Sequence, residues 1–189
     1  MGTRPEETVR GPAKRVMNLD KESIWISYCK GMVDAGNTAR FARFTSHHRL
    51  ATPVSPWERL KIGAGTPPIL TRHGWLIIYH GVCEAVHTVS REHPLCYSAG
   101  VMVLSKQHPR VIRYRSIKPA LTPTLPQERE GTVANVVFPT GIDRRDDLGT
   151  PDRFDVYYGM ADNRIGAERL DLPDCLPAEA DADSQESKV

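Results

Sequence analysis

Short apolar and aromatic runs, separated by glycine, proline and polar residues, dominate the middle of this chain. Most of these runs are rich in β-branched and aromatic residues, which is typical of β-strands bounded by turns. A long amphipathic helix is not evident, because the periodicity of residues 34–49 is too weak to separate a short helix from a loop. The pattern therefore predicts an all-β fold. The predicted strands span residues 24–28, 75–81, 101–104, 111–114, 135–139 and 154–159.

The two ends of the chain differ from this central part. Residues 1–19 are polar and basic, with arginines and a lysine between Pro and Gly, and we expect an irregular lead-in. Residues 173–189 have almost no apolar side chain to bury, so we expect a disordered acidic tail. Residues 20–172 are left as the single predicted domain.

A weak internal repeat runs through the central part. A proline-containing segment, a polar turn and an aromatic strand that ends near Tyr and Gly occur in residues 67–81 and again in residues 136–159. Residues 24–31 look like the last strand of a third copy. Antiparallel repeats of this kind suggest the blades of a β-propeller. A β-sandwich also gives short alternating strands, and the pattern alone favours neither architecture.

Composition and charge narrow the range of partners. The chain has 189 residues, 25 of them basic and 23 acidic, and its hydrophobic share of 40% is ordinary for a globular protein. A net charge of +2 spread along the chain leaves no polybasic patch, so we expect neither nucleic acid nor an anionic membrane as a partner. No apolar run reaches the length of a transmembrane helix, and the first residues contain no apolar signal region. We therefore expect a cytoplasmic protein.

The sequence shows no recognisable metal-binding pattern. The four cysteines are scattered and form no C-x-x-C pair, which predicts reduced thiols. Several histidines also lack partners at metal-ligand spacing, and we expect them to face solvent. We predict neither a metal nor an organic cofactor. The cysteines are Cys29, Cys83, Cys96 and Cys175, and the histidines without metal-ligand spacing are His47, His48, His73 and His108.

Four stretches of the chain together resemble a known family. They contain Lys-Ile-Gly-Ala-Gly-Thr-Pro-Pro, then Gly-Trp-Leu-Ile-Ile-Tyr-His-Gly, then Glu-Arg-Glu-Gly-Thr-Val-Ala-Asn-Val-Val-Phe, and finally Tyr-Tyr-Gly-Met-Ala-Asp. Their order and spacing resemble the β-1,4-mannoside phosphorylases of glycoside hydrolase family 130. The resemblance covers about residues 23–172. The stretches themselves span residues 55–69, 74–82, 128–141 and 156–162.

The resemblance implies a five-bladed β-propeller with its active site at one mouth of the central channel. The matching stretches belong to the C-terminal half of such a domain, so this chain would form an incomplete propeller of about three blades. Because an incomplete ring leaves open blade faces, the expected partners include an oligomer or a complementing chain.

The reaction implied by the resemblance is inverting phosphorolysis. Inorganic phosphate, a co-substrate, attacks the anomeric carbon of a β-1,4-mannoside and gives mannose 1-phosphate and a shortened oligosaccharide. Lys61 and His80 match the family positions that bind phosphate, Lys61 as a point charge and His80 as a hydrogen-bond donor. Taken alone, Lys61 reads as a surface lysine and His80 as a structural histidine at a strand end.

The same resemblance suggests residues for the sugar. Asp162 matches a family aspartate that accepts hydrogen bonds from mannose hydroxyls, although an Asp here also fits a simple turn. Gly63 and Gly65 would let the backbone approach the ligand or turn tightly. Tyr97 and Asn135 would line the pocket, whereas aromatic residues in strands more often belong to the core.

One departure from the family affects the expected activity. The family's general-acid aspartate lies in its N-terminal half, within a Glu-Asp-Pro-Arg-type motif, and this sequence contains no such motif. We therefore assign no catalytic residue and expect low or no activity from the chain alone, because an unprotonated alkoxide is a poor leaving group. The alternatives are a non-catalytic carbohydrate-binding or remnant propeller fragment and a β-mannoside hydrolase of the same fold, which would be expected to lack the Lys61–His80 pair.

Overall fold

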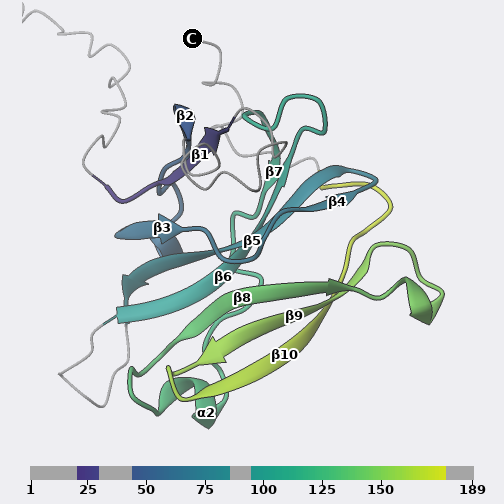
Figure 1. Cartoon of the computed structure of the whole chain (residues 1–189). Coiled ribbons are helices and arrows are strands. Elements are labelled where there is room, and N and C mark those ends of the chain that lie inside the picture. The colour runs from purple at the N-terminus through teal and green to yellow at the C-terminus, as the bar shows by residue number, and fades with distance from the viewer. Residues whose placement is uncertain (1–20, 30–43, 86–94, 178–189) are drawn as a thin grey trace, which may run out of the picture.

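The computed structural model describes residues 21–29, 44–85 and 95–177, and this part of the chain is built almost entirely from β-strands (Figure 1). The predicted lead-in over residues 1–19 lies outside the described residues, as do residues 178–189 of the predicted tail. The helical elements in the described ranges are three single turns, η1 (Pro56–Glu58), α2 (Pro126–Arg129) and η2 (Asp146–Leu148). The all-β prediction is confirmed.

The described strands form three antiparallel sheets. The first sheet pairs β1 (Ile24–Tyr28) with β2 (Thr45–Ala51). The middle sheet has the order β3-β5-β6-β7, with β4 also beside β5, and the third has the order β10-β9-β8. None of the three closes on itself in the described ranges. The middle strands are β3 (Lys61–Gly63), β4 (Ile69–Thr71), β5 (Gly74–Glu84), β6 (Leu95–Leu104) and β7 (Ile112–Arg115), and the third-sheet strands are β8 (Val137–Arg144), β9 (Arg153–Met160) and β10 (Arg164–Asp171).

Each of the six predicted strands overlaps an observed strand, but four strands were not predicted. For residues 34–49 the sequence left helix and loop open, and residues 45–49 of that stretch belong instead to strand β2. Its sequence, Thr-Ser-His-His-Arg-Leu-Ala, is too polar for a strand signal, and pairing with β1 holds it in place. β10 is mostly exposed and pairs along its whole length with β9, while β3 and β4 have only three residues each.

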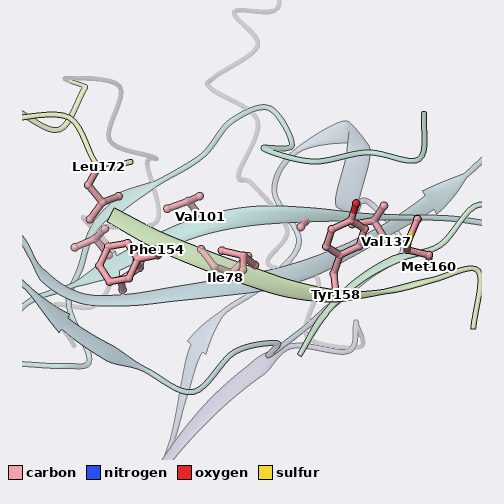
Figure 2. Packing of buried hydrophobic residues seen from close by; sticks show 11 residues of the cluster. Ile78, Val101, Val137, Phe154, Tyr158, Met160 and Leu172 are labelled. Carbon is pink, nitrogen blue, oxygen red and sulfur yellow. The ribbon is translucent and has the colours of Figure 1, made fainter. Parts of the chain in front are cut away.

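The middle sheet is buried on both faces, which gives a three-layer arrangement. One apolar cluster separates it from the third sheet (Figure 2), and a second separates it from β1 and β2. A two-sheet sandwich has a single core between its layers, so it does not describe this stacking. The first cluster contains Leu76, Ile78, Ala99, Val101, Val103, Val137, Phe154, Val156, Tyr158, Met160 and Leu172. The second contains Ile24, Leu50, Ala51, Ile62, Ile77, Tyr79, Met102, Leu104 and Ile112.

A fully buried carboxylate, Glu58, fixes the segment that leads into the middle sheet. Its Oε1 accepts the backbone N–H groups of Val54 and Ser55 at 3.0 and 3.1 Å. Arg115 Nη2 donates to the same oxygen at 2.8 Å, and the Tyr79 hydroxyl donates to Oε2 at 2.9 Å. Because both charged side chains have an exposed fraction of 0%, their pairing and hydrogen bonds must offset a large desolvation cost.

The third sheet repeats this arrangement. Glu128 is also buried, and its Oε2 accepts the N–H groups of Thr124 and Leu125 at 2.8 and 2.9 Å. The Tyr158 hydroxyl donates to Oε1 at 2.9 Å. Both glutamates stand in a Pro-x-Glu-Arg segment, and each accepts a hydrogen bond from a tyrosine on a long strand that follows, Tyr79 on β5 or Tyr158 on β9. The internal repeat is therefore physical, with β8, β9 and β10 corresponding to β3/β4, β5 and β6.

Replacing Glu58 with Gln removes the negative charge and nearly preserves the size of the side chain. Removing one partner of a buried ion pair costs about 3–5 kcal/mol, and we expect a loss of that order in the free energy of unfolding. Urea denaturation followed by tryptophan fluorescence measures it. Asp171→Asn is the control, because Asp171 pairs with Arg153 while 46% exposed, and its loss should be much smaller. A Glu58→Gln variant as stable as the parent would contradict a structural role for the pair.

Glu128 predicts a pH dependence of stability. Burial alone would raise its pKa, but the amides of Leu125 and Thr124 and the Tyr158 hydroxyl hold the pKa below the usual glutamate value of 4.5. A carboxylate whose pKa is lowered by folding stabilises the folded state fully at pH values above its unfolded-state pKa. This contribution disappears as the pH falls through the folded-state pKa. We therefore expect Glu128→Gln to cost about 1–3 kcal/mol at neutral pH and progressively less in acid. Glu130→Gln is the control, because Glu130 is an exposed neighbour. If Glu128→Gln lost the same free energy of unfolding at neutral pH as in acid, this linkage would be ruled out.

Candidate active site

Lys61, His80 and Tyr97 lie on one face of the middle sheet, at the end where β5 finishes and β6 begins. Lys61 pairs with Val82, and Val82 pairs with Tyr97, while His80 is two residues from Val82 on β5. Residues paired directly or two apart share a face of the sheet. The Lys61 Nζ atom lies 5.8 Å from the centroid of the Tyr97 ring, and the ring centroids of His80 and Tyr97 are 6.3 Å apart. The structure thus brings together the two predicted phosphate ligands.

A residue that the sequence analysis did not single out completes this cluster. Phe138, on β8 of the third sheet, has its ring centroid 4.4 Å from that of His80 and 6.5 Å from that of Tyr97. The Asn-Val-Val-Phe segment belongs to one of the stretches that resemble the family, but the sequence did not indicate that the Phe138 ring contacts a residue of another sheet. The cluster therefore has an aromatic wall on two sides of the imidazole.

The environment of His80 defines the state of its ring. Its Nδ1 atom lies 3.1 Å from the carbonyl oxygen of Ala64, which can only accept a hydrogen bond, so Nδ1 carries the hydrogen. Burial lowers the pKa of His80; the Ala64 bond opposes that shift and the charge of Lys61 adds to it, so that the net pKa lies below the ordinary value. His80 is accordingly neutral near neutral pH.

Lys61 is held loosely enough to accept another anion. Its Nζ lies 3.5 Å from Glu22 Oε2, and the two side chains are 35% and 70% exposed. Exposed ion pairs contribute little net free energy.

The two predicted glycines have different local roles. A Cβ atom at Gly63, which pairs with His80, would lie 2.6 Å from His80 Nε2, so the glycine makes room for the imidazole. A Cβ atom at Gly65 would lie 2.9 Å from the Pro139 carbonyl oxygen and would also collide with that of Ile78. Gly65 therefore lets the chain pass between β5 and β8. Contact of either glycine with a ligand stays a prediction.

Asn135 and Asp162 lie at the same end of the third sheet. The Asn135 carbonyl accepts the Tyr97 N–H at 2.9 Å, which ties it to the cluster through the backbone. Asp162 is exposed in the β9–β10 turn, with a left-handed φ of 50°, beside Ala161, whose N–H donates to Val136. Within the described residues, no hydrogen bond or ion pair links Asp162 to Lys61 or His80, so the structure does not join it directly to the predicted phosphate ligands.

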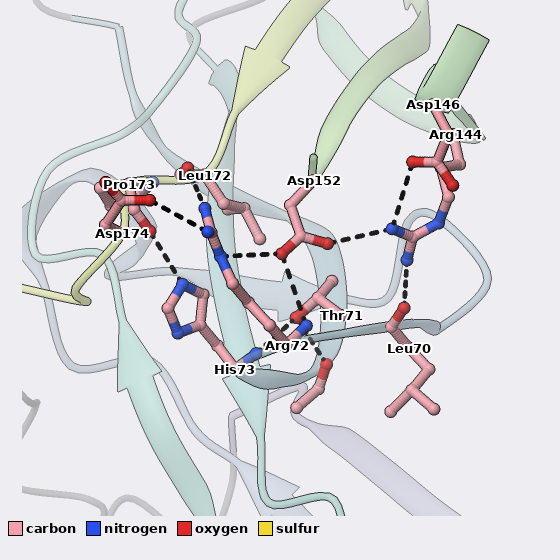
Figure 3. A network of polar contacts seen from close by, with 11 residues as sticks. Leu70, Thr71, Arg72, His73, Arg144, Asp146, Asp152, Leu172, Pro173 and Asp174 are labelled. Carbon is pink, nitrogen blue, oxygen red and sulfur yellow. Dashed lines mark hydrogen bonds and ion pairs between the residues drawn. The ribbon is translucent and has the colours of Figure 1, made fainter. Parts of the chain in front are cut away.

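The opposite end of these two sheets carries a separate polar network (Figure 3). Asp152, whose side chain is 5% exposed, accepts Arg72 Nε at 3.0 Å and Arg144 Nη1 at 3.0 Å. Arg72 also pairs with Asp174 at 3.0 Å, and His73 Nε2 lies 2.8 Å from the Pro173 carbonyl. The open hollow beside Asp152 is thus lined by arginines that already have carboxylate partners. Arg72 connects the sheets to the first residues of the predicted tail, and both Arg72 and Arg144 already pair with carboxylates among the described residues.

Two absences concern other classes of site. In the described ranges, no three His, Cys, Asp or Glu side chains stand close enough together to hold a metal ion. The same part of the chain contains no helix long and apolar enough to cross a membrane.

Comparison with known proteins gives a consistent group of relatives. A family model described as beta-1,4-mannooligosaccharide phosphorylase matches residues 13–176. A 1,2-beta-oligomannan phosphorylase from Thermoanaerobacter sp. (strain X514) is 34% identical over 152 residues, covering 80% of this chain and 44% of that protein. A beta-1,4-mannooligosaccharide phosphorylase from Ruminococcus albus is 38% identical over 119 residues, covering 63% of this chain and 33% of that protein. The chain spans less than half the length of these relatives.

A solved structure shares the architecture. The beta-1,2-mannobiose phosphorylase from Listeria innocua, in complex with beta-1,2-mannobiose, superposes with a TM-score of 0.56 at 28% sequence identity. The match covers 68% of this chain and 33% of the Listeria chain. The stacking of antiparallel sheets is therefore common to both proteins.

Gly63→Ala tests how the imidazole is accommodated. The new methyl group would push the His80 ring towards solvent, so we expect its pKa, measured by NMR titration, to rise towards the ordinary histidine value. Gly141→Ala is the matched control, because the nearest atom to a Cβ there would be Cδ2 of Tyr157, 3.6 Å away, which is an ordinary van der Waals contact. An unchanged His80 titration in a folded Gly63→Ala variant would contradict the proposed fit.

Proposed function

This chain belongs to glycoside hydrolase family 130, and we propose that it contributes the phosphate-binding side of a site for inverting phosphorolysis of β-mannosides. An oxygen of inorganic phosphate attacks the anomeric carbon, the bond to the glycosidic oxygen breaks, and that oxygen leaves with a proton. The products are mannose 1-phosphate and a shortened oligosaccharide. One observation carries the proposal: Lys61 and His80 share one face of the middle sheet, beside the aromatic rings of Tyr97 and Phe138.

The chemistry of that cluster suits an anion next to a sugar. Lys61 supplies a mobile positive charge, and His80 supplies a fixed polar nitrogen. The rings of Tyr97 and Phe138 offer apolar surface against which the carbon face of a sugar can pack. In this arrangement phosphate takes the place that an activated water would occupy in a hydrolase, and the reaction needs no other cofactor.

The proposed substrate is a β-1,4-mannoside. The description of the matching family model and the Ruminococcus albus relative support this linkage, whereas other relatives are named for β-1,2 linkages. Asp162, Asn135, Gly63 and Gly65 are proposed to face the sugar. Incubating the chain with β-1,4-mannobiose and, separately, with β-1,2-mannobiose under the same conditions decides which linkage is cleaved.

We place the leaving-group proton donor outside the present sequence. The three sheets would be successive blades of a propeller, within a domain of residues 20–172, and the remaining blades and the general acid would come from another polypeptide segment or chain. The absence of a Glu-Asp-Pro-Arg motif from this sequence also supports a second candidate, a carbohydrate-binding fragment without catalysis.

Isothermal titration of the chain with inorganic phosphate tests the proposed site. Loss of a charge-assisted hydrogen bond of about 1.5–3 kcal/mol predicts at least a tenfold weaker affinity for Lys61→Ala. Lys106→Ala, an exposed lysine at the opposite end of the sheet, is the control and should bind normally. Equal affinities for the parent and Lys61→Ala would contradict the assignment.

Activity separates the candidates. Incubation with mannose 1-phosphate and a mannose or N-acetylglucosamine acceptor should release phosphate slowly if the chain is a phosphorylase. Release of free mannose from mannobiose without phosphate would indicate a hydrolase instead. Saccharide binding with neither reaction would favour the non-catalytic fragment.

A further inference from the structure

The hydrogen bond between His80 and Ala64 determines what kind of oxyanion this site prefers. A backbone carbonyl has no hydrogen to donate, so the 3.1 Å contact requires the hydrogen of His80 to be on Nδ1. In the neutral ring, Nε2 then carries only a lone pair and must accept a hydrogen bond. A fully deprotonated oxygen placed against that lone pair would be repelled.

Phosphate and sulfate differ in this respect. Near neutral pH, phosphate carries a proton on at least one oxygen, whereas sulfate carries none and offers acceptors only. The two anions are otherwise similar in shape and in their attraction to Lys61. A site with one ammonium donor and one imidazole acceptor is therefore complementary to hydrogen phosphate and mismatched to sulfate, because an unmatched polar group in a partly buried site is costly.

We propose that neutral His80 accepts the P–OH hydrogen of the bound anion and thereby makes the site select phosphate over sulfate. The inference rests on the proposed function, since it assumes that Lys61 and His80 share one oxyanion. It also assigns His80 a different role from the hydrogen-bond donor suggested by the resemblance. The phosphate oxygens directed away from His80 remain free of protons and available for nucleophilic attack.

The neighbours of His80 favour this neutral, accepting state. Lys61 on β3 is the charged group that faces it, with Glu22 beyond, and Tyr97 is the titratable group that β6 contributes. β8 contributes only the ring of Phe138, which packs against the imidazole at 4.4 Å between centroids. In the described ranges, no carboxylate is bonded to the ring to stabilise a second proton. A Cβ atom at Gly63 would lie 2.6 Å from His80 Nε2, so the ring packs closely over that glycine.

Isothermal titration of the whole chain with phosphate, arsenate and sulfate at about pH 8 tests the proposal, since an ordinary histidine is neutral there. We expect phosphate to bind at least about tenfold more tightly than sulfate, because a site that bonds a hydroxyl rejects analogues without one. Arsenate, which is also protonated under these conditions, should follow phosphate despite its larger size.

Variants separate selectivity from general anion attraction. His80→Gln replaces the acceptor by an amide that can donate to either anion, so the phosphate-to-sulfate ratio should fall towards one. Lys61→Ala should weaken both anions by a similar factor and leave the ratio unchanged. His73→Gln, at the distant end of β5, is the control and should retain the parent ratio.

The outcomes distinguish the two levels of the argument. Equal binding of phosphate and sulfate by the parent, or an unchanged ratio in His80→Gln, would overturn the role of His80 while leaving the phosphate site intact. Failure of the parent to bind phosphate at all would overturn the proposed function and this inference with it.

Discussion

The buried Glu58 carboxylate is the contact on which the geometry of the site depends. It joins the segment before β3 to Tyr79 in the middle of β5 and to Arg115 on β7. Successive strand residues point to opposite faces. Tyr79 is therefore fixed on the face that packs against β1 and β2, while its neighbour His80 projects from the face that packs against the third sheet. Lys61 follows Glu58 by three positions. One buried polar network thus sets the positions of both candidate phosphate ligands without touching the ligand.

The repeated architecture shows how one scaffold position can serve two purposes. In the middle sheet, Gly63 on β3 lies opposite His80 on β5, and in the third sheet Phe138 on β8 lies opposite Gly159 on β9. Each pair combines a ring with a glycine, but the ring stands on different strands. The two pairs occupy equivalent places in the two sheets, and the imidazole of the one packs beside the phenyl ring of the other, with centroids 4.4 Å apart.

The parts of this structure that local sequence determines were predictable, and the parts that depend on register were not. β1, β5 and β9 carry enough β-branched and aromatic residues to be recognised, whereas polar β2 and exposed β10 are strands because a neighbour pairs with them. Lys61 and His80 were found through family resemblance, and the structure places them on one face. The contact of Phe138 with His80 and the space made by Gly63 involve separate strands, and residue patterns along the chain do not encode such meetings.

The interface between the middle and third sheets has side-chain contacts at both of its ends. Aromatic rings close it beside Lys61, and Asp152 ties Arg72 to Arg144 at the far end, with apolar packing between. The walls of the proposed site are thus held together by contacts within the protein itself. Binding there would need little conformational ordering of the protein, so more of the contact free energy would appear as affinity.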